Sequence, residues 1–408
     1  MDFSPSTTAD GEPTSWTHFP TWLPGGRNVP IMLGPYKLVV DEWAEVWDLL
    51  RPYADASFWQ WDQIEFDPEC YYIVGRLQIK EHWQRIRDLA QIHPGHIIFC
   101  NPAEGSETIL LQLKRLRIRD LVEQGQLGLI TSGDLEPGLS YLKTDGYFSN
   151  IVTYTENQEA HDRAPEIQTK TKYYDFLFLN GRLRPHRKYL IDGLRQADVL
   201  KGALWSNLNH TVSMPWSSAL KVGDSEPLRF LPLHYEIPRA LPNLAAAQQQ
   251  DFAKHVMFGN TWGDAIVNPL CYVDSCFSLV TETIFDYPYT FRTEKIWKPM
   301  IMEHPFVVAA NRGFYRDLRN AGFRTFDHVI DESFDLIDDP QDRADRIIAI
   351  VRDICYNGAW NFLKQSREVC EHNYARLQEH NREQREKLPQ DLAEYIEKLA
   401  YEKSKENK

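Results

Sequence analysis

The feature that most restricts the fold of this chain is an alternation of short apolar runs with segments of helical periodicity. The runs YYIVG (71–75), HIIFC (96–100) and LGLITSG (127–133) each have the length of one buried strand. Apolar residues at helical spacing fill the segment 79–92 between the first two runs. Fully apolar strands that alternate with helices are typical of a parallel sheet covered on both faces. We therefore expect a Rossmann-like α/β domain here, with a fourth strand at 148–154.

The same alternation restarts near residue 174 and predicts a second α/β domain. Its expected strands are 174–180, 203–208, 276–282 and 305–310. Helices are expected over 293–302, 312–322 and 341–355, and a long charged helix over 359–402. The polar segment 156–172 has one proline and no apolar periodicity, which favours a linker. The first thirty residues, rich in Pro, Ser, Thr and Gly, predict an irregular arm.

The predicted fold class is therefore α/β, with two Rossmann-like domains. We expect an N-terminal domain over 1–165, a C-terminal domain over 170–365 and a helical tail over 366–408. No internal repeat with the period of a solenoid is visible.

Composition narrows the setting in which such a chain would work. The 58 Asp and Glu residues outnumber the 45 Lys and Arg residues, and the net charge of −13 disfavours a general nucleic-acid coat. Six cysteines are too few for a disulfide scaffold, so free thiols are expected. The polar, acidic first residues do not form a signal peptide, and no apolar run approaches the ~20 residues of a membrane span. These features predict a soluble, cytoplasmic protein.

A basic loop follows the expected strand at 174–180. Between residues 171 and 201, seven Lys and Arg side chains accompany three Asp side chains, which gives a local charge of +4. The candidate phosphate-binding residues of this loop are Asn180, Arg182, Arg184 and Arg187. Arginines at a strand end beside a helix N-terminus suit a phosphate, because the guanidinium groups and the helix dipole both favour an anion. The alternative interpretation is a solvated turn.

A second candidate cluster spans the next strand end and the start of the following helix. Glu282 ends the expected strand at 276–282, and Thr293, Glu294 and Lys295 open the helix at 293–302. A carboxylate in such a position can hold sugar or ribose hydroxyls while the lysine contacts phosphate. Alternatively, Glu294 is a first-turn residue favoured by the helix dipole. Ligands of α/β sheets bind beyond the carboxyl ends of the strands, so the clusters together predict a pocket for a nucleoside diphosphate.

The run FSLVTETIFDYPYTFRTEKIWKPMIMEHPFVV (277–308) resembles the donor-binding segment of GT-B glycosyltransferases, particularly the α-1,3-fucosyltransferases. Those enzymes have a strand, a Glu-containing turn, a variable loop, then Thr-Glu-Lys, an apolar helix and another strand. The upstream segment 177–187 is similar to the first unit of their C-terminal domain, and the resemblance covers about 174–335. The Phe-Glu-Asn turn of the family is replaced here by the residues 280–283, so the identity of the sugar is not transferred.

The resemblance implies a GT-B fold, in which a C-terminal helix crosses back onto the first domain. It also implies that Arg187 and Lys295 bind the pyrophosphate of a GDP- or UDP-sugar. Glu294 would then bind the ribose, and Glu282 would lie near the donor sugar in a catalytic position. Cations and a helix dipole, rather than a metal ion, would stabilise the diphosphate leaving group. The expected activity is transfer of the sugar to a hydroxyl of a glycan or, less favoured, of a modified DNA base. Similar sequences are common in bacterial and phage-encoded glycosyltransferases, which fits a soluble form.

A general base must deprotonate the acceptor hydroxyl, and the family's base is not transferred because no family motif aligns in the N-terminal half. Glu104 lies in the loop 101–107, which follows an expected strand and faces the expected cleft, so it is the candidate base. The alternative is a helix-starting turn with Ser106 as N-cap. The acidic segment 331–345, which contains Asp338 and Asp339, precedes a helix and is interpreted as a capping and solubilising run rather than a metal site.

Two alternatives remain at this stage. The run Arg115–Arg119 (RLRIR) is the best patch for a DNA acceptor, but the sequence favours a solvated helix face there. The second alternative is a non-catalytic module that binds a nucleotide or nucleic acid and has retained the donor pocket without turnover.

Overall fold

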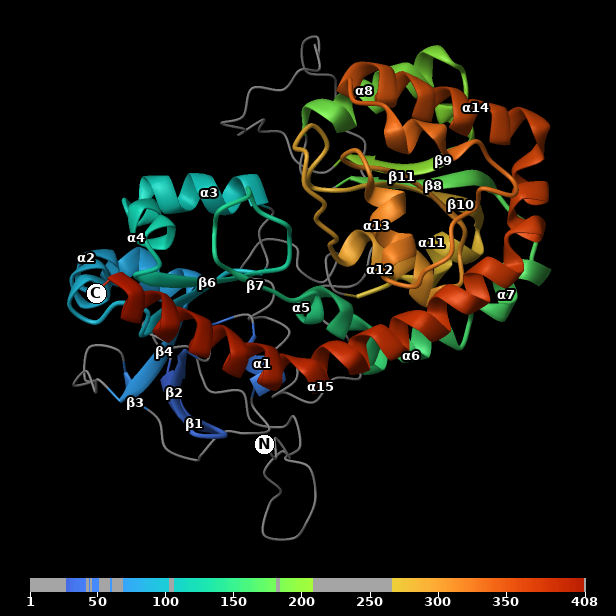
Figure 1. Cartoon of the computed structure of the whole chain (residues 1–408). Coiled ribbons are helices and arrows are strands. Elements are labelled where there is room, and N and C mark those ends of the chain that lie inside the picture. Colours follow the sequence, from blue (N-terminus) through green and yellow to red (C-terminus); the bar gives the residue numbers. More distant parts are fainter. Residues whose placement is uncertain are drawn as a thin grey trace, which may run out of the picture. The chain divides into compact units, whose positions relative to one another are not determined.

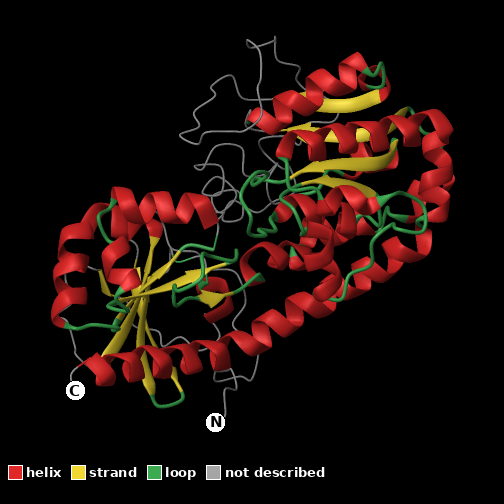
Figure 2. Ribbon diagram, turned by 45° about the horizontal axis from the view of Figure 1, so that its top comes forward, coloured by secondary structure: helices red, strands yellow, loops and turns green. Residues whose placement is uncertain are grey.

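The computed structural model describes residues 27–41, 44, 46–50, 59–60, 69–102, 106–180, 184–207 and 266–406. The chain forms two compact units (Figure 1). Unit 1 contains the described residues up to Phe148 and those from Asn381 onward, and unit 2 contains those from Ser149 to His380. Each unit is an α/β structure in which helices flank a sheet (Figure 2).

Unit 1 is built on a seven-stranded sheet in the order β3-β1-β2-β4-β5-β6-β7. Its strands are β1 (Arg27–Leu33), β2 (Tyr36–Asp41), β3 (Trp59–Gln60), β4 (Cys70–Gly75), β5 (Ile97–Cys100), β6 (Leu127–Thr131) and β7 (Leu142–Lys143). The strands from β2 to β7 along this order run parallel, whereas β1 pairs antiparallel with β2 and β3. Part of the segment expected to be an irregular arm is therefore the strand β1.

The parallel strands of unit 1 follow one another in chain order across the sheet. Crossovers between parallel strands are right-handed almost without exception, so an unreversed order sends the connecting helices to a single face. These helices are α2 (Arg76–Ile92), α3 (Ser106–Arg115) and α4 (Arg119–Glu123). On the other face the short helix α1 (Trp47–Leu50), which lies between β2 and β4, contributes Leu49 and Leu50 to the core, and the rest of the cover comes from elsewhere in the chain.

The end of the C-terminal helix α15 (Arg367–Glu406) provides that cover. Its buried side chains Leu388, Leu392, Ala393, Tyr395, Ile396 and Leu399 join one core cluster with the sheet residues Leu38, Val40, Ile73, Ile98, Cys100 and Ile130. The hydroxyl of Tyr395 accepts a hydrogen bond from the backbone N–H of Leu129 at 2.9 Å. A Cβ atom on Gly128 would lie 2.9 Å from Leu399 Cδ1, so a glycine allows the helix to approach the sheet closely.

Unit 2 contains a four-stranded parallel sheet in the order β11-β10-β8-β9. Its strands are β8 (Tyr174–Asn180), β9 (Ala203–Asn207), β10 (Ser275–Thr281) and β11 (Phe306–Ala309). From β8 the chain moves outward to β9, and from β10 it moves outward in the opposite direction to β11. The order therefore reverses between β8 and β10, which makes that position the topological switch point of a doubly wound sheet.

Helices cover both faces of this second sheet. The helices α8 (Pro185–Gln196) and α14 (Pro340–Gln365) lie on one side, and α12 (Glu294–Ile301) and α11 (Pro269–Val273) lie on the other (Figure 1). The helix α13 (Phe314–Asn320) follows β11. A Cβ atom on Gly193 of α8 would lie 2.3 Å from Ile348 Cδ1 of α14, which shows how closely these two helices pack.

The strands expected at 71–75, 96–100, 127–133, 174–180, 203–208, 276–282 and 305–310 are confirmed within two residues at each end. The expected strand at 148–154 is wrong. That segment forms the end of α5 (Gly146–Ser149) and the 3₁₀ helix η3 (Asn150–Thr153). The Thr153 hydroxyl donates to the carbonyl of Asn150 at 2.8 Å, a local bond that favours the helical turn over an extended strand.

The linker expected over 156–172 is also wrong, because most of it is helical. It forms α6 (Thr155–His161) and α7 (Pro165–Thr169), with Pro165 at the first helical position, where proline is favoured. Ion pairs join Glu166 to Arg163 at 2.9 Å and to Lys170. Side-chain pairs at this spacing stabilise short polar helices that lack strong apolar periodicity.

The capping interpretation of the acidic segment is confirmed. Asp339 is the N-cap of α14 and accepts hydrogen bonds from the backbone N–H groups of Gln341 and Asp342 at 2.8 and 2.9 Å. Asp335 accepts from the N–H groups of Tyr315 and Arg316 and so caps α13 from outside that helix. Each carboxylate thus satisfies helix N–H groups that would otherwise lack an acceptor.

All six cysteines are free thiols, and five of them are buried. None of the described helices combines the length and the apolarity needed to cross a bilayer.

Candidate functional site

The carboxyl ends of β8 and β10 meet at the switch point of unit 2. Asn180 is the last residue of β8 and Thr281 is the last residue of β10. The Thr281 hydroxyl donates to Asn180 Oδ1 at 2.7 Å, so the two strand ends are joined by a side-chain hydrogen bond. Ligands of open α/β sheets bind at this position because the loops on its two sides diverge.

Asn180 is fully buried, and one of its polar atoms is not satisfied. Its backbone N–H donates to Ser206 Oγ on β9 at 3.1 Å, and its Oδ1 accepts from Thr281. Its Nδ2 is buried and has no hydrogen-bond partner among the described residues. A buried donor without an acceptor costs about 1–3 kcal/mol, which a ligand oxygen at this position would recover.

The helix α8 begins beside these strand ends. Arg184 is its N-cap, Pro185 is at the first helical position, and the Arg184 side chain makes no capping hydrogen bond. The Arg187 guanidinium, which is 3% exposed, donates to the carbonyl of Thr281 at 3.1 Å. The N-terminus of α8 and its arginines therefore lie against the end of β10, where the helix dipole favours an anion.

The buried His186 contacts the loop that follows β10. Its Nε2 lies 3.0 Å from the carbonyl oxygen of Glu282, which can only accept, so Nε2 carries the proton. The ring stacks on Phe285 at a centroid distance of 5.1 Å. Burial, followed by the neighbouring Arg187 and Arg184, holds the pKa of His186 well below its usual value, so the ring is neutral.

Glu282 holds the loop after β10 in place. Its Oε2 accepts from the Thr293 hydroxyl at 2.7 Å, and its Oε1 accepts from the Thr293 backbone N–H at 3.2 Å. The side chain is fully buried, and burial raises its pKa even though Lys295 lowers it. Glu282 is therefore bonded to the start of α12, which is a positioning contact. The catalytic role expected from the resemblance stays a prediction.

Thr293, Glu294 and Lys295 form the first turn of α12. Thr293 is the N-cap and accepts from the Lys295 backbone N–H at 3.3 Å and from Lys295 Nζ at 3.1 Å. Lys295 Nζ also pairs with Glu294 Oε1 at 2.5 Å. Burial raises the pKa of Glu294, but Lys295 and Lys298 lower it by more than burial raises it. The net pKa therefore lies below the usual value, and the carboxylate is charged.

Arg343 supports this loop from α14. It is 2% exposed, and its guanidinium donates to the carbonyl oxygens of Phe285 at 2.5 Å and Ile337 at 2.6 Å. The guanidinium carbon also lies 4.6 Å from the centre of the Phe285 ring. Burial lowers the pKa of Arg343. The loop between β10 and α12 is thus fixed by Glu282, His186 and Arg343.

The structure brings together most of the residues that the sequence singled out. Those at the switch point are Asn180, Arg184, Arg187, Glu282, Thr293, Glu294 and Lys295. Glu104 and Arg182 lie outside the described residues. Thr281 and Arg343 were not expected, and nothing in the local sequence marks them, because both act through backbone or amide groups of distant segments.

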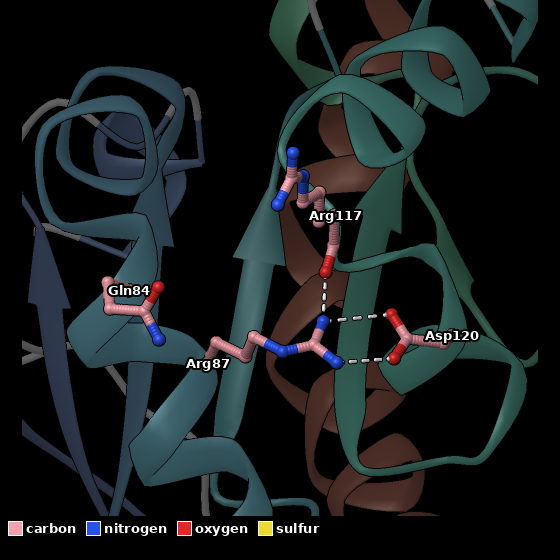
Figure 3. A pocket seen from close by; sticks show the side chains of 4 residues that line it. All are labelled: Gln84, Arg87, Arg117 and Asp120. Carbon is pink, nitrogen blue, oxygen red and sulfur yellow. Dashed lines mark hydrogen bonds and ion pairs between the residues drawn. The ribbon is translucent and has the colours of Figure 1, made fainter.

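A separate cavity of about 320 Å³ lies in unit 1, where it is lined by Gln84, Arg87, Arg117 and Asp120 (Figure 3). In the described part of the chain, no group of three or more His, Cys, Asp and Glu side chains is arranged to hold a metal ion. Comparisons with protein-family models, with curated proteins and with solved structures find no match to this chain.

The role of Glu282 can be tested with two substitutions. We expect Glu282→Gln to lower the stability of unit 2 less than Glu282→Ala does, because the glutamine Oε1 can still accept from the Thr293 N–H. Glu282→Ala leaves that buried N–H without an acceptor and should lower the free energy of unfolding by about 1–3 kcal/mol. Both values can be measured by urea unfolding.

The stability of Glu282→Gln is also expected to depend on pH differently from that of the wild type. A carboxyl group whose folded pKa is raised contributes its full stability below the unfolded pKa and loses it as the pH rises through the folded pKa. Glu282→Gln should therefore gain stability relative to the wild type as the pH increases from about 4 to 7. A Gln variant that loses as much stability as the Ala variant at every pH contradicts the positioning role.

Proposed function

We propose that unit 2 binds a nucleoside-diphosphate sugar and that the protein is a glycosyltransferase with a GDP- or UDP-sugar donor. The observation that carries this proposal is the convergence of three chain segments at one switch point. Asn180, the first turn of α8 and the first turn of α12 lie around the bonded ends of β8 and β10. Each provides a donor or a cation suited to phosphate.

The chemistry of the donor explains why such a site is useful. When the sugar leaves, negative charge develops on the diphosphate, and fixed cations and N–H groups stabilise it in the transition state. Arg187 is buried and bonded to the Thr281 carbonyl at the N-terminus of α8, so little reorganisation is needed during the reaction. Glu294 and Lys295 would orient the nucleoside end of the donor, as the resemblance implies.

A GT-B arrangement is part of the same proposal. It is supported by the two α/β units and by α15, whose last turns pack in the core of unit 1. The acceptor would be a glycan or another hydroxyl compound.

The proposal is tested by a panel of GDP- and UDP-sugars in isothermal titration calorimetry with the full chain. We expect at least one donor to bind, and Lys295→Ala to weaken it about tenfold, because one charge-assisted hydrogen bond contributes about 1.5–3 kcal/mol. Lys201→Ala is the matched control, since Lys201 is an exposed lysine paired with Asp198. Absence of binding across the panel rejects the proposal.

The second candidate is a nucleotide-binding module without turnover. It is favoured by the burial of Glu282, whose oxygens are bonded to Thr293 and are therefore not directed at a substrate. Formation of a glycosylated product, or hydrolysis of the bound donor, excludes this module.

A further inference from the structure

The basic run Arg115–Arg119 does not form the solvated helix face that its sequence favoured. The helix α3 ends at Arg115 and α4 begins at Arg119, so the run is a turn between two helices. Arg117 in this turn has a φ of +56°, in the left-handed region that residues other than glycine rarely adopt. Residues held in this way are concentrated at functional sites.

Neighbouring groups hold the turn in this conformation. Arg87 on α2 donates to the carbonyl oxygen of Arg117 and forms two hydrogen bonds to Asp120, at 3.0 and 2.6 Å. Together with Gln84 these residues line the cavity of about 320 Å³, and the Arg117 side chain extends away from the Arg87–Asp120 pair (Figure 3). The turn is therefore a fixed structure beside a hollow in the surface.

This surface is basic although the protein as a whole is acidic. The segments 84–88 and 114–123 contain six Lys and Arg residues and three Asp and Glu residues, and Glu136 also pairs with Arg119, so the local charge is +2 in a chain of −13. Lys114, Arg115 and Arg117 are exposed and have no carboxylate partner among the described residues. Charges farther away than about 10 Å are largely screened at physiological salt, so the total charge does not cancel this patch.

We propose that the α3–α4 turn binds the phosphodiester backbone of a nucleic acid through Lys114, Arg115 and Arg117. Exposed cations on a fixed turn suit a chain of phosphates, because binding is driven by release of counterions along the polymer. Leu113 and Ile118 are buried and Leu116 is half-buried, so residues 113–118 have no fully exposed apolar side chain to insert into a bilayer, which disfavours a membrane surface. The site lies in unit 1 and is independent of the proposed donor site.

The test is fluorescence anisotropy with a labelled 20-base-pair DNA duplex, a DNA single strand and an RNA single strand of the same length. We expect binding at 50 mM salt that weakens as salt rises, with a slope of log K against log[salt] of about −2.7 for three phosphate contacts to the duplex. Replacement of Lys114, Arg115 and Arg117 by Ala should reduce the affinity at least tenfold and remove most of this slope. Comparison of the three nucleic acids shows which source of the phosphodiester is preferred.

The matched control replaces three exposed cations of unit 2, Arg352, Lys364 and Arg367, by Ala and should bind as the wild type does. A second variant, Arg117→Gly, separates folding from binding. Glycine adopts a positive φ without strain, so this variant should be at least as stable as the wild type yet bind nucleic acid several-fold more weakly.

Three results would overturn the proposal. The first is that the wild type binds none of the nucleic acids at 50 mM salt. The second is that the variant lacking Lys114, Arg115 and Arg117 binds as well as the control variant. In the third, the protein binds vesicles containing 30% phosphatidylserine and no nucleic acid. An Arg187→Ala protein should retain nucleic-acid binding, so failure of the donor proposal does not affect this test.

Discussion

A chain that ends at Lys387 is expected to lose the cooperative unfolding of unit 1. The shortened chain lacks Leu388, Leu392, Ile396 and Leu399, which are at most 2% exposed and cover one face of the seven-stranded sheet. Truncation of one such side chain to Ala typically costs 2–5 kcal/mol, and the whole stability of a domain is about 5–15 kcal/mol. Loss of all four therefore exceeds what the unit can tolerate.

The measurement is urea unfolding followed by circular dichroism, together with limited proteolysis and mass spectrometry of the fragments. Fragments of unit 1 should disappear first, while fragments from Ser149–His380 persist. A chain that ends at Tyr401 is the control, because it keeps every α15 side chain of the core cluster. Gly128→Val, which would place side-chain atoms against Leu399, should act in the same direction through overpacking. An unchanged unfolding curve for the chain ending at Lys387 contradicts the covering role of α15.

The second large effect is expected for Arg187→Ala, which should weaken donor binding about a hundredfold or more. Two charge-assisted hydrogen bonds contribute about 1.5–3 kcal/mol each, and 1.4 kcal/mol corresponds to a factor of ten. Arg187→Lys keeps the charge but loses the planar fork, so it should show an intermediate loss. Calorimetry with the donor that binds the wild type gives both values.

The control for Arg187 has to separate binding from folding, because its guanidinium also donates to the Thr281 carbonyl. The midpoint temperature of thermal unfolding without ligand should fall by a similar amount for the Ala and Lys variants, since both lose the guanidinium that makes this bond. Their donor affinities should nevertheless differ. Equal affinities for the wild type and Arg187→Ala, in a protein that remains folded, would exclude Arg187 from the donor site.

Much of the fold of unit 2 follows from local sequence patterns. Strands such as β8 and β10 are apolar runs of strand length, and the N-cap at Asp339 precedes a periodic segment, so each could be predicted within its own window. The segments 148–154 and 156–172 were misassigned because a local window shows no clear pattern there. Short helices held by Thr153 or by the Glu166 ion pairs have too few residues to show a period.

The candidate site divides in the same way. Local sequence places Asn180, Arg187 and Lys295 at strand ends or helix starts, because those positions depend on neighbours in the chain. The hydrogen bonds between Asn180 and Thr281 and between Glu282 and Thr293 depend instead on how the chain folds. Each of these bonds joins groups that meet only when β8 and β10 pair or when α12 docks.

The helix α15, which packs on the unit 1 sheet, is a larger example of a contact that local sequence does not predict. The sequence of 359–402 predicts a charged helix, and it does not state which core its few apolar residues will enter. That choice depends on the uninterrupted strand order of unit 1, which leaves one face with only the short helix α1 of its own. Local pattern therefore determined the elements of this protein, while the pairing order of its strands decided what covers them and which side chains meet, because burial depends on contacts between distant segments.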